Sequence, residues 1–196
     1  MADYPETPMT DTHNPAIADT RRWVETAVIG LNLCPFARAP YVRSQVHFAV
    51  TEATDDEGIA EALLAEIHQL QALPAEERET TLLILTEGLA DFDAFNDFLG
   101  LADNLLEHLE LDGTFQIASF HPDYRFADTP DDAIDNYTNR SPLPILHILR
   151  EDSVAEAAEA MDDPDAIYRA NIERLRALGH DGWRRLWPSN ASPDRR

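Results

Sequence analysis

Strand-like segments alternate with amphipathic helical segments along this chain, and this alternation constrains its fold most. Residues 43–51 alternate apolar and polar side chains, as a half-buried strand does. Residues 80–86 form a continuous apolar run, which is typical of a strand covered on both faces. Residues 114–121 and 145–150 are the two other strand-like segments. The sequence therefore predicts an α/β fold with a four-stranded, largely parallel or mixed sheet covered by helices. The direction of the fourth strand stays open.

Capping signals and apolar periodicity place the helices between these strands. Asn14-Pro15 is an N-cap followed by proline at the first helical position, so a helix is expected to begin here. Pro35 marks the end of this helix. Ser153 and Glu156 form a capping box for a short alanine-rich helix. The other predicted helices are an amphipathic segment at 59–70, a segment from Asp91 to Leu109, a two-turn helix at 130–138, and a last helix from Asp163-Pro164 to Gly179.

No internal repeat and no linker-like segment divides the 196 residues. We therefore expect one domain at residues 14–188, which is within the usual size of a single hydrophobic core. The polar segments 1–13 and 189–196 are expected to be disordered tails.

Acidic residues outnumber basic ones, 37 against 15, which gives a formal net charge of −22. Such a surface repels phosphate backbones and anionic lipids, so we expect neither nucleic acid nor a membrane as partner. No apolar run reaches the ~18 residues of a membrane span, and the N-terminus lacks the basic and apolar regions of a signal peptide. The single cysteine excludes an internal disulfide. The expected location is the cytoplasm, while cofactor and oligomeric state stay unknown.

The stretch SFHPDYRF, residues 119–126, is the first candidate site. His121 ends a predicted strand, and ligands of open α/β sheets bind outside the carboxyl ends of the strands. The loop that follows is rich in side chains that commonly contact ligands: Asp123, Tyr124, Arg125, Asn136, Tyr137, Asn139, Arg140 and Ser141. The alternative is a solvated, well-capped loop that is polar because turns favour such residues. Composition alone favours this alternative.

Cys34 is the second candidate, within LNLCPFARAP at residues 31–40. A lone cysteine is most often a small buried apolar residue. A nucleophile needs a stabilised thiolate, and the C-terminal end of a helix disfavours an anion. Activation would have to come from Arg38, or from His121 or Arg140 folded onto the thiol.

His147 shares one face of its predicted strand with Ile145 and Leu149. It is therefore either a ligand-binding residue or a core histidine whose ring nitrogens are hydrogen-bonded within the protein. No glycine-rich phosphate loop, nucleophile elbow or His-Glu-x-x-His helix is present. A metal site built from Cys34, His121, Asp123 or His147 has no spacing signature, so no metal ligand is assigned.

The segments VIGLNLCPFA, ETTLLI, DFDAFNDFL, ASFHPDY, NYTNRSP, LHILRE and NIERLRALGHDGW occur in this order between Trp23 and Trp187. Together they resemble a bacterial family catalogued only as a domain of unknown function. The resemblance implies no activity, substrate or cofactor. Its signature blocks centre on polar loop residues around Cys34, His121 and Arg140, and loop residues define a family mainly when they bind or react. The resemblance therefore favours a site over a merely solvated loop.

We expect Cys34, His121 and Arg140 to line one pocket at the strand ends. In the first hypothesis the chain is a small-molecule enzyme, in which His121 is the acid–base group, tuned by Asp123. Cys34 is then the nucleophile or a metal ligand, and Arg140 with Arg38 holds a carboxylate or phosphate of an anionic ligand. The remaining expected binding residues are Tyr124, Asn136, Tyr137, Asn139, Ser141 and His147.

The alternative hypothesis is a non-catalytic ligand-binding or accessory protein that uses the same loops. In that case Arg140 and Asn136 tie the loop to the fold, and Cys34 is an inert thiol. A reactive Cys34 thiol favours the enzyme, and an inert, buried one favours the binding protein.

Overall fold

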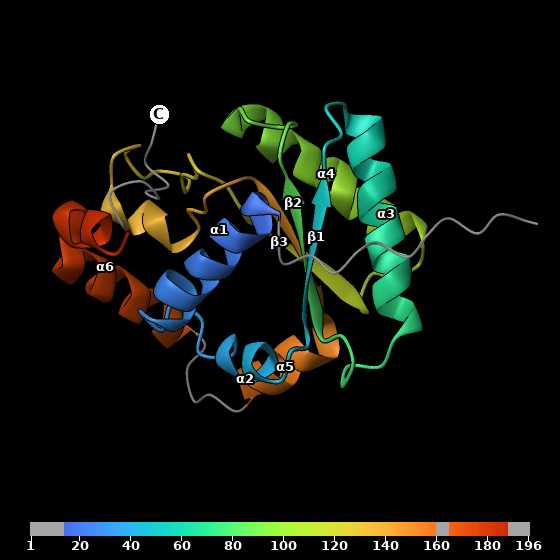
Figure 1. Cartoon of the computed structure of the whole chain (residues 1–196), viewed down its shortest axis with the longest axis horizontal. Coiled ribbons are helices and arrows are strands. Elements are labelled where there is room, and N and C mark those ends of the chain that lie inside the picture. Colours follow the sequence, from blue (N-terminus) through green and yellow to red (C-terminus); the bar gives the residue numbers. More distant parts are fainter. Residues whose placement is uncertain (1–13, 160–164, 188–196) are drawn as a thin grey trace, which may run out of the picture.

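A four-stranded mixed sheet forms the centre of the fold, in a computed structural model that describes residues 14–159 and 165–187 (Figure 1). Its strands are β1 (Val46–Thr51), β2 (Thr80–Leu85), β3 (Phe115–Phe120) and β4 (Ile145–Arg150), in the order β1-β2-β4-β3. β1 and β2 are parallel, whereas β4 is antiparallel to both β2 and β3. The predicted α/β fold with a mixed sheet is confirmed.

The antiparallel direction of β4, which the sequence left open, follows from the loop that precedes it. Residues 121–144 leave β3 and return to the sheet at the same end, where Phe120 stands opposite Ile145. The N–H of Leu85 donates to the carbonyl of Pro144 at 3.0 Å. β1, β2 and β3 therefore finish where β4 begins, and we call this the carboxyl end of the sheet.

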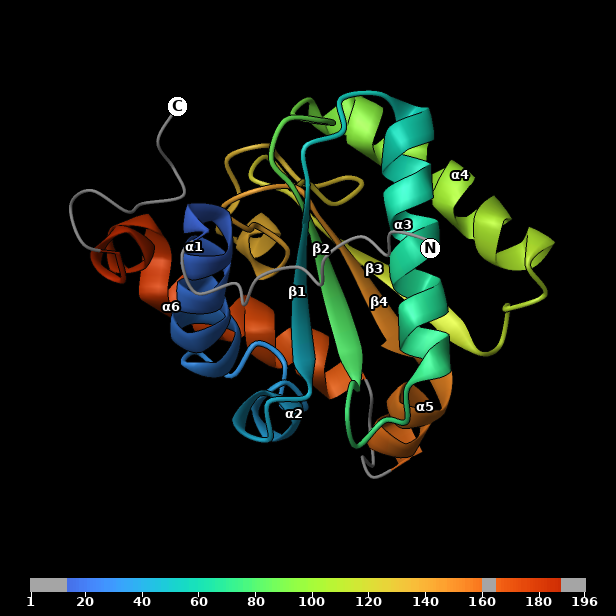
Figure 2. The ribbon, with the colours of Figure 1, turned by 45° about the vertical axis from the view of Figure 1, so that its right-hand side comes forward.

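Helices cover both faces of the sheet (Figure 2). One layer contains α3 (Asp56–Ala72) and α4 (Phe92–His108); the other contains α1 (Pro15–Trp23), the π-helix η1 (Val24–Ile29) and α6 (Asp165–Arg185). In the first layer Leu63 and Phe95 are fully buried against the sheet. In the second layer Trp23 and Trp183 are buried together with Phe48 and Ile145 of the sheet. Burial of apolar surface on both faces is the main stabilising term of such a fold.

β2 lies between β1 and β4, and all six of its residues are buried. This explains why the segment at 80–86 reads as a continuous apolar run instead of an alternating one. Among the residues that the structure describes, no helix combines the length and the apolar composition needed to cross a bilayer.

The start of the first helix is as predicted, but its course is not. Asn14 Oδ1 accepts a hydrogen bond from the N–H of Ala16 at 2.9 Å, and Pro15 occupies the first helical position. The helix is α-helical only to Trp23 and continues as η1. A further short helix, α2 (Arg38–Val42), was not predicted.

One prediction for the C-terminal helices is wrong, and one is confirmed. α5 (Glu151–Glu159) begins directly after β4, so Ser153 is not its N-cap; the N–H of Glu151 instead donates to the carbonyl of Thr114, the residue before β3, at 3.0 Å. Gly179 interrupts α6 as predicted: its φ of 63° and ψ of 172° are not helical, and a second helical segment follows it to Arg185.

The helix predicted at 130–138 is a shorter 3₁₀ helix, η2 (Ile134–Thr138). The predicted start of the last helix at Asp163-Pro164 lies outside the described residues, as do the predicted tails at 1–13 and 189–196.

His147 of β4 lies inside the sheet layer, with its ring 6.0 Å from that of Phe120. Its Nε2 atom is 2.7 Å from Oγ1 of Thr80, and this hydroxyl donates its own proton to the carbonyl of Ile148 at 2.6 Å. The Thr80 oxygen therefore accepts from His147, which fixes the proton on Nε2. Burial lowers the pKa of His147 to about 4.

This lowered pKa predicts a loss of stability in acid. An unfolded histidine takes a proton near pH 6.5, whereas folded His147 resists protonation until about pH 4, so stability falls as pH drops through this window and levels off below it. The loss attributable to His147 is at most about 3 kcal/mol, because the residue is only partly buried. Urea unfolding at pH 7 and pH 4.5 should show a smaller acid loss for His147→Gln than for the unmodified chain. His68→Gln, on the exposed side of α3, is the control, and an equal acid loss in His147→Gln would contradict the assignment.

Candidate functional site

His121 joins the loop after β3 to the segment before α4. Its side chain is fully buried, and its ring packs 5.1 Å from that of Phe95. Nδ1 accepts a hydrogen bond from the backbone N–H of Asp123 at 3.0 Å, so Nε2 carries the proton and donates to the carbonyl of Leu89 at 3.1 Å. Both ring nitrogens thus bond to backbone groups. This is the geometry of a structural histidine, and it leaves neither nitrogen directed at a ligand.

Asn136 holds the middle of the same loop. It is fully buried in η2, and its Oδ1 accepts from the N–H of Phe126 at 3.1 Å. Its Nδ2 donates to the carbonyl of Pro130 at 2.9 Å. A buried amide with partners on both atoms stabilises the loop, because buried polar groups without partners are costly.

Asn139 and Ser141 bind the last part of the loop to β3. Asn139 Nδ2 donates to the carbonyl of Ser119 at 3.1 Å, and the carbonyl of Asn139 accepts from the N–H of His121 at 3.2 Å. Ser141 is fully buried, and its hydroxyl donates to the carbonyl of Leu143 at 2.5 Å. The NYTNRSP segment therefore lies along the outer side of β3.

Arg140 makes contacts within this loop. Nε donates to the carbonyl of Tyr124 at 3.3 Å, and Nη2 donates to the carbonyl of Asp131 at 2.6 Å. The guanidinium lies 4.4 Å from the ring centre of Tyr137, which is buried against Trp183 of α6. These contacts fit the alternative in which Arg140 anchors the loop.

A pocket of about 420 Å³ lies at the carboxyl end of the sheet, between the start of α4 and the loop after β3. Its lining residues are Ala90, Asp91, Phe92, Asp93, Asp123 and Arg125. Asp91 caps α4 by accepting from the N–H of Ala94 at 3.0 Å. Arg125 pairs with Asp93, and its guanidinium lies 5.3 Å from the ring centre of Phe92. The Asp123 carboxylate has no hydrogen-bond or ion-pair partner within the described part of the chain.

The pocket carries an excess of negative charge, because three carboxylates face one guanidinium that is already paired. No group of three or more histidine, cysteine, aspartate or glutamate side chains among residues 14–159 and 165–187 is placed to hold a metal ion. The lining therefore suits a cationic organic group better than an anion.

Cys34 does not take part in this pocket. It lies in the turn of residues 30–37 that leads into α2, and α2 lies beside the amino end of β1 (Figures 1 and 2), whereas His121 follows the carboxyl end of β3. Burial raises the pKa of the Cys34 thiol, although the backbone N–H groups of Phe36 and Ala37 oppose this increase. A nucleophilic cysteine needs the opposite shift. The expected pocket shared by Cys34, His121 and Arg140 is therefore not formed.

The other predicted residues divide into three groups. Asp123 lines the pocket, and the ring of Tyr124 packs 5.2 Å from that of Phe92 beside it. Asn136, Tyr137, Asn139, Arg140 and Ser141 order the loop. Arg38 is exposed on α2, and His147 lies in the sheet.

Sequence reasoning missed the contribution of α4, namely Asp91, Phe92 and Asp93. The signal was present, because a helix that begins just after β2 must start at the carboxyl end of the sheet, beside the end of β3.

Comparison with known proteins gives one match. A family model described as "Protein of unknown function (DUF1415)" matches residues 15–185. No curated protein and no solved structure matches the chain.

The contacts of Arg140 predict that both Arg140→Ala and Arg140→Lys lower the melting temperature. Arg140→Ala removes two hydrogen bonds of ~1 kcal/mol each, and ~1 kcal/mol shifts a domain of this size by about 2–4 °C, so we expect a loss of about 4–8 °C. Lysine should recover little of it, because an ammonium lacks the planar fork that reaches both carbonyls. Differential scanning calorimetry measures the shift, with Arg38→Ala on the exposed side of α2 as control. Unchanged melting in both Arg140 variants would show that Arg140 does not anchor the loop.

Proposed function

We propose that this chain, which belongs to the family of unknown function that matches residues 15–185, is a binding protein for a small molecule with a cationic group. The binding site is the pocket between the start of α4 and the loop after β3. The observation that carries the proposal is the carboxylate of Asp123, which has no partner among the described residues, in a pocket whose lining guanidinium, that of Arg125, is already bound to Asp93.

The charge of the lining supports a cation over the anionic ligand that the arginines first suggested. Arg140 donates to loop carbonyls through Nε and Nη2, and Arg125 pairs with Asp93, so both guanidinium groups already have partners within the protein. An ammonium or guanidinium entering the pocket would meet Asp123 directly. Charge-assisted hydrogen bonds of this kind are about twice as strong as neutral ones.

The aromatic side chains at the pocket favour a ligand that also carries an apolar group. Phe92 lines the pocket, and its ring contacts those of His121 and Tyr124 at 5.4 and 5.2 Å. Because His121 and Phe95 hold this wall from behind, the ring of Phe92 is fixed without a ligand. Pre-organised aromatic surface lowers the entropic cost of binding.

The hydrogen bonds of His121 and the raised pKa of the Cys34 thiol favour binding over catalysis, because an enzyme would use these two side chains. The His121 nitrogens are bonded to the Asp123 N–H and the Leu89 carbonyl. The Cys34 thiol has a raised pKa and lies in another part of the fold. General acid–base catalysis needs a group within hydrogen-bond reach of the substrate.

Isothermal titration calorimetry with benzylamine, butylamine and methylguanidine tests the proposal, with butyrate and phosphate as anionic comparisons. We expect at least one cation to bind and neither anion to do so. Asp123→Asn should weaken that binding by about tenfold to a hundredfold, because a charge-assisted hydrogen bond is lost. The control is Asp132→Asn, an exposed carboxylate of the same loop that does not line the pocket. Equal cation affinity in Asp123→Asn, or binding of the anions alone, would refute the proposal.

A further inference from the structure

The two edge strands of the sheet differ in how their outer backbone groups are used. Just before β3, the carbonyl of Thr114 accepts from the N–H of Glu151, which directly follows β4, so in this register the odd-numbered residues of β3 direct their backbone outward. Four of these outward groups are bonded to the loop or to the preceding turn: the Phe115 N–H, the Ser119 carbonyl, and the N–H and carbonyl of His121. Among the described residues, the outward groups from the Phe115 carbonyl to the Ser119 N–H have no partner, so the edge of β3 is covered at its two ends.

The outer backbone of β1 is not used in this way. The carbonyls of Gln45 and Thr51 accept from the N–H groups of Glu79 and Thr86, at 2.9 and 3.1 Å, so the odd-numbered residues of β1 face β2. The N–H and C=O groups of Val46, Phe48 and Val50 therefore point away from the sheet. Within the described residues none of them has a hydrogen-bond partner. Figure 1 shows no described helix or strand in front of β1.

We propose that β1 pairs with β1 of a second copy of this chain, antiparallel, about a two-fold axis at Phe48. In this register Phe48 stands opposite itself and Val46 stands opposite Val50. Every outward N–H then meets an outward C=O of the other copy, so no group in the row is left without a partner. The sheet continues from one copy into the next, which is the pairing that unprotected edge strands favour.

The charges at the two ends of β1 favour a second copy of this chain over another protein as the partner of this strand. Arg43 precedes β1 and Glu52 follows it, both are exposed, and neither has an ion-pair partner among the described residues. The antiparallel register places Glu52 of the partner subunit opposite Ser44, one residue from Arg43, and the two-fold axis repeats this proximity of opposite charges at the other end. Two ion pairs related by the two-fold axis thus set the register and offset the repulsion between two acidic chains.

The composition of β1 agrees with this role. The strand VHFAVT contains no proline, glycine, lysine or acidic residue, which are the residues that usually block an edge. Phe48 is buried in the core of its own copy, so the pairing needs no rearrangement of the core.

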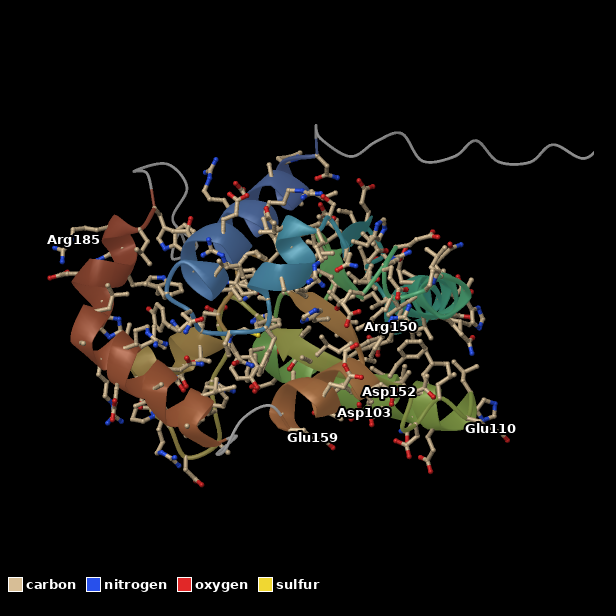
Figure 3. All side chains as sticks on the ribbon, turned by 90° about the horizontal axis from the view of Figure 1, so that it is seen from below. Asp103, Glu110, Arg150, Asp152, Glu159 and Arg185 are labelled. Carbon is tan, nitrogen blue, oxygen red and sulfur yellow. The ribbon has the colours of Figure 1, made fainter. Side chains whose placement is uncertain are left out.

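The test is sedimentation equilibrium over a range of concentrations, in about 0.15 M salt. We expect a monomer–dimer equilibrium in the unmodified chain. Arg43→Glu and Glu52→Arg should each raise the dimer Kd by about tenfold or more, because two attractive pairs become two repulsive ones. A mixture of the two variants should form a heterodimer, since each end then carries opposite charges again. The control is Arg185→Glu, which makes the same charge change at the end of α6 (Figure 3).

Hydrogen exchange supplies the second readout. The amides of Val46, Phe48 and Val50 should exchange fast in dilute monomer and slowly in dimer. Val50→Pro removes an N–H that has no partner within the described chain, so it should abolish the dimer, while Val50→Ala, which also loses the packing of Val50 against the core but keeps the N–H, should retain it. A chain that is monomeric at every concentration would overturn the proposal, as would a dimer that Arg43→Glu, Glu52→Arg and Val50→Pro leave intact. Slow exchange of these amides in the monomer would also overturn it, because the chain itself would then cover the edge.

Discussion

The imidazole of His121, held between the N–H of Asp123 and the carbonyl of Leu89, is the interaction on which the pocket depends. It connects two segments that follow different strands: the loop after β3 and the turn that opens α4. These segments form the two walls of the pocket. Because the ring is fully buried, both of its hydrogen bonds form in a low-dielectric environment, where they are strong and costly to break. His121 therefore fixes the spacing of the walls without contacting a ligand itself.

The rest of the connection from β3 to β4 is ordered by the same means. Asn136, Asn139 and Arg140 each donate to backbone carbonyls of the loop or of β3, so a long connection with little regular structure is tied down at several points. This gives the polar residues of this connection a structural role in ordering it. Their side chains replace the backbone ladder that a strand or helix would supply.

Strands and helix starts could be predicted from the sequence where the signal is local. The apolar runs at 80–86 and 145–150 marked strands, and Asn14 marked a helix start, because each signal lies within a few adjacent residues. The position of Cys34 relative to His121 depends on which end of the sheet each segment reaches, and local patterns do not contain this information. The backbone hydrogen bonds of His121 could not be predicted for a similar reason. A histidine at the end of a strand looks the same in a sequence whether its nitrogens face a ligand or the backbone.

We propose that His121 is a structural element of the binding site and not its acid–base group. Nitrogen NMR of the His121 ring at neutral pH tests this most directly, because the shifts of Nδ1 and Nε2 report where the proton lies. The structure predicts a single tautomer, with the proton on Nε2 and an accepting Nδ1, that stays the same when an amine ligand is added. A proton on Nδ1, or exchange between the two nitrogens, would contradict the account, because one nitrogen would then be free for proton transfer.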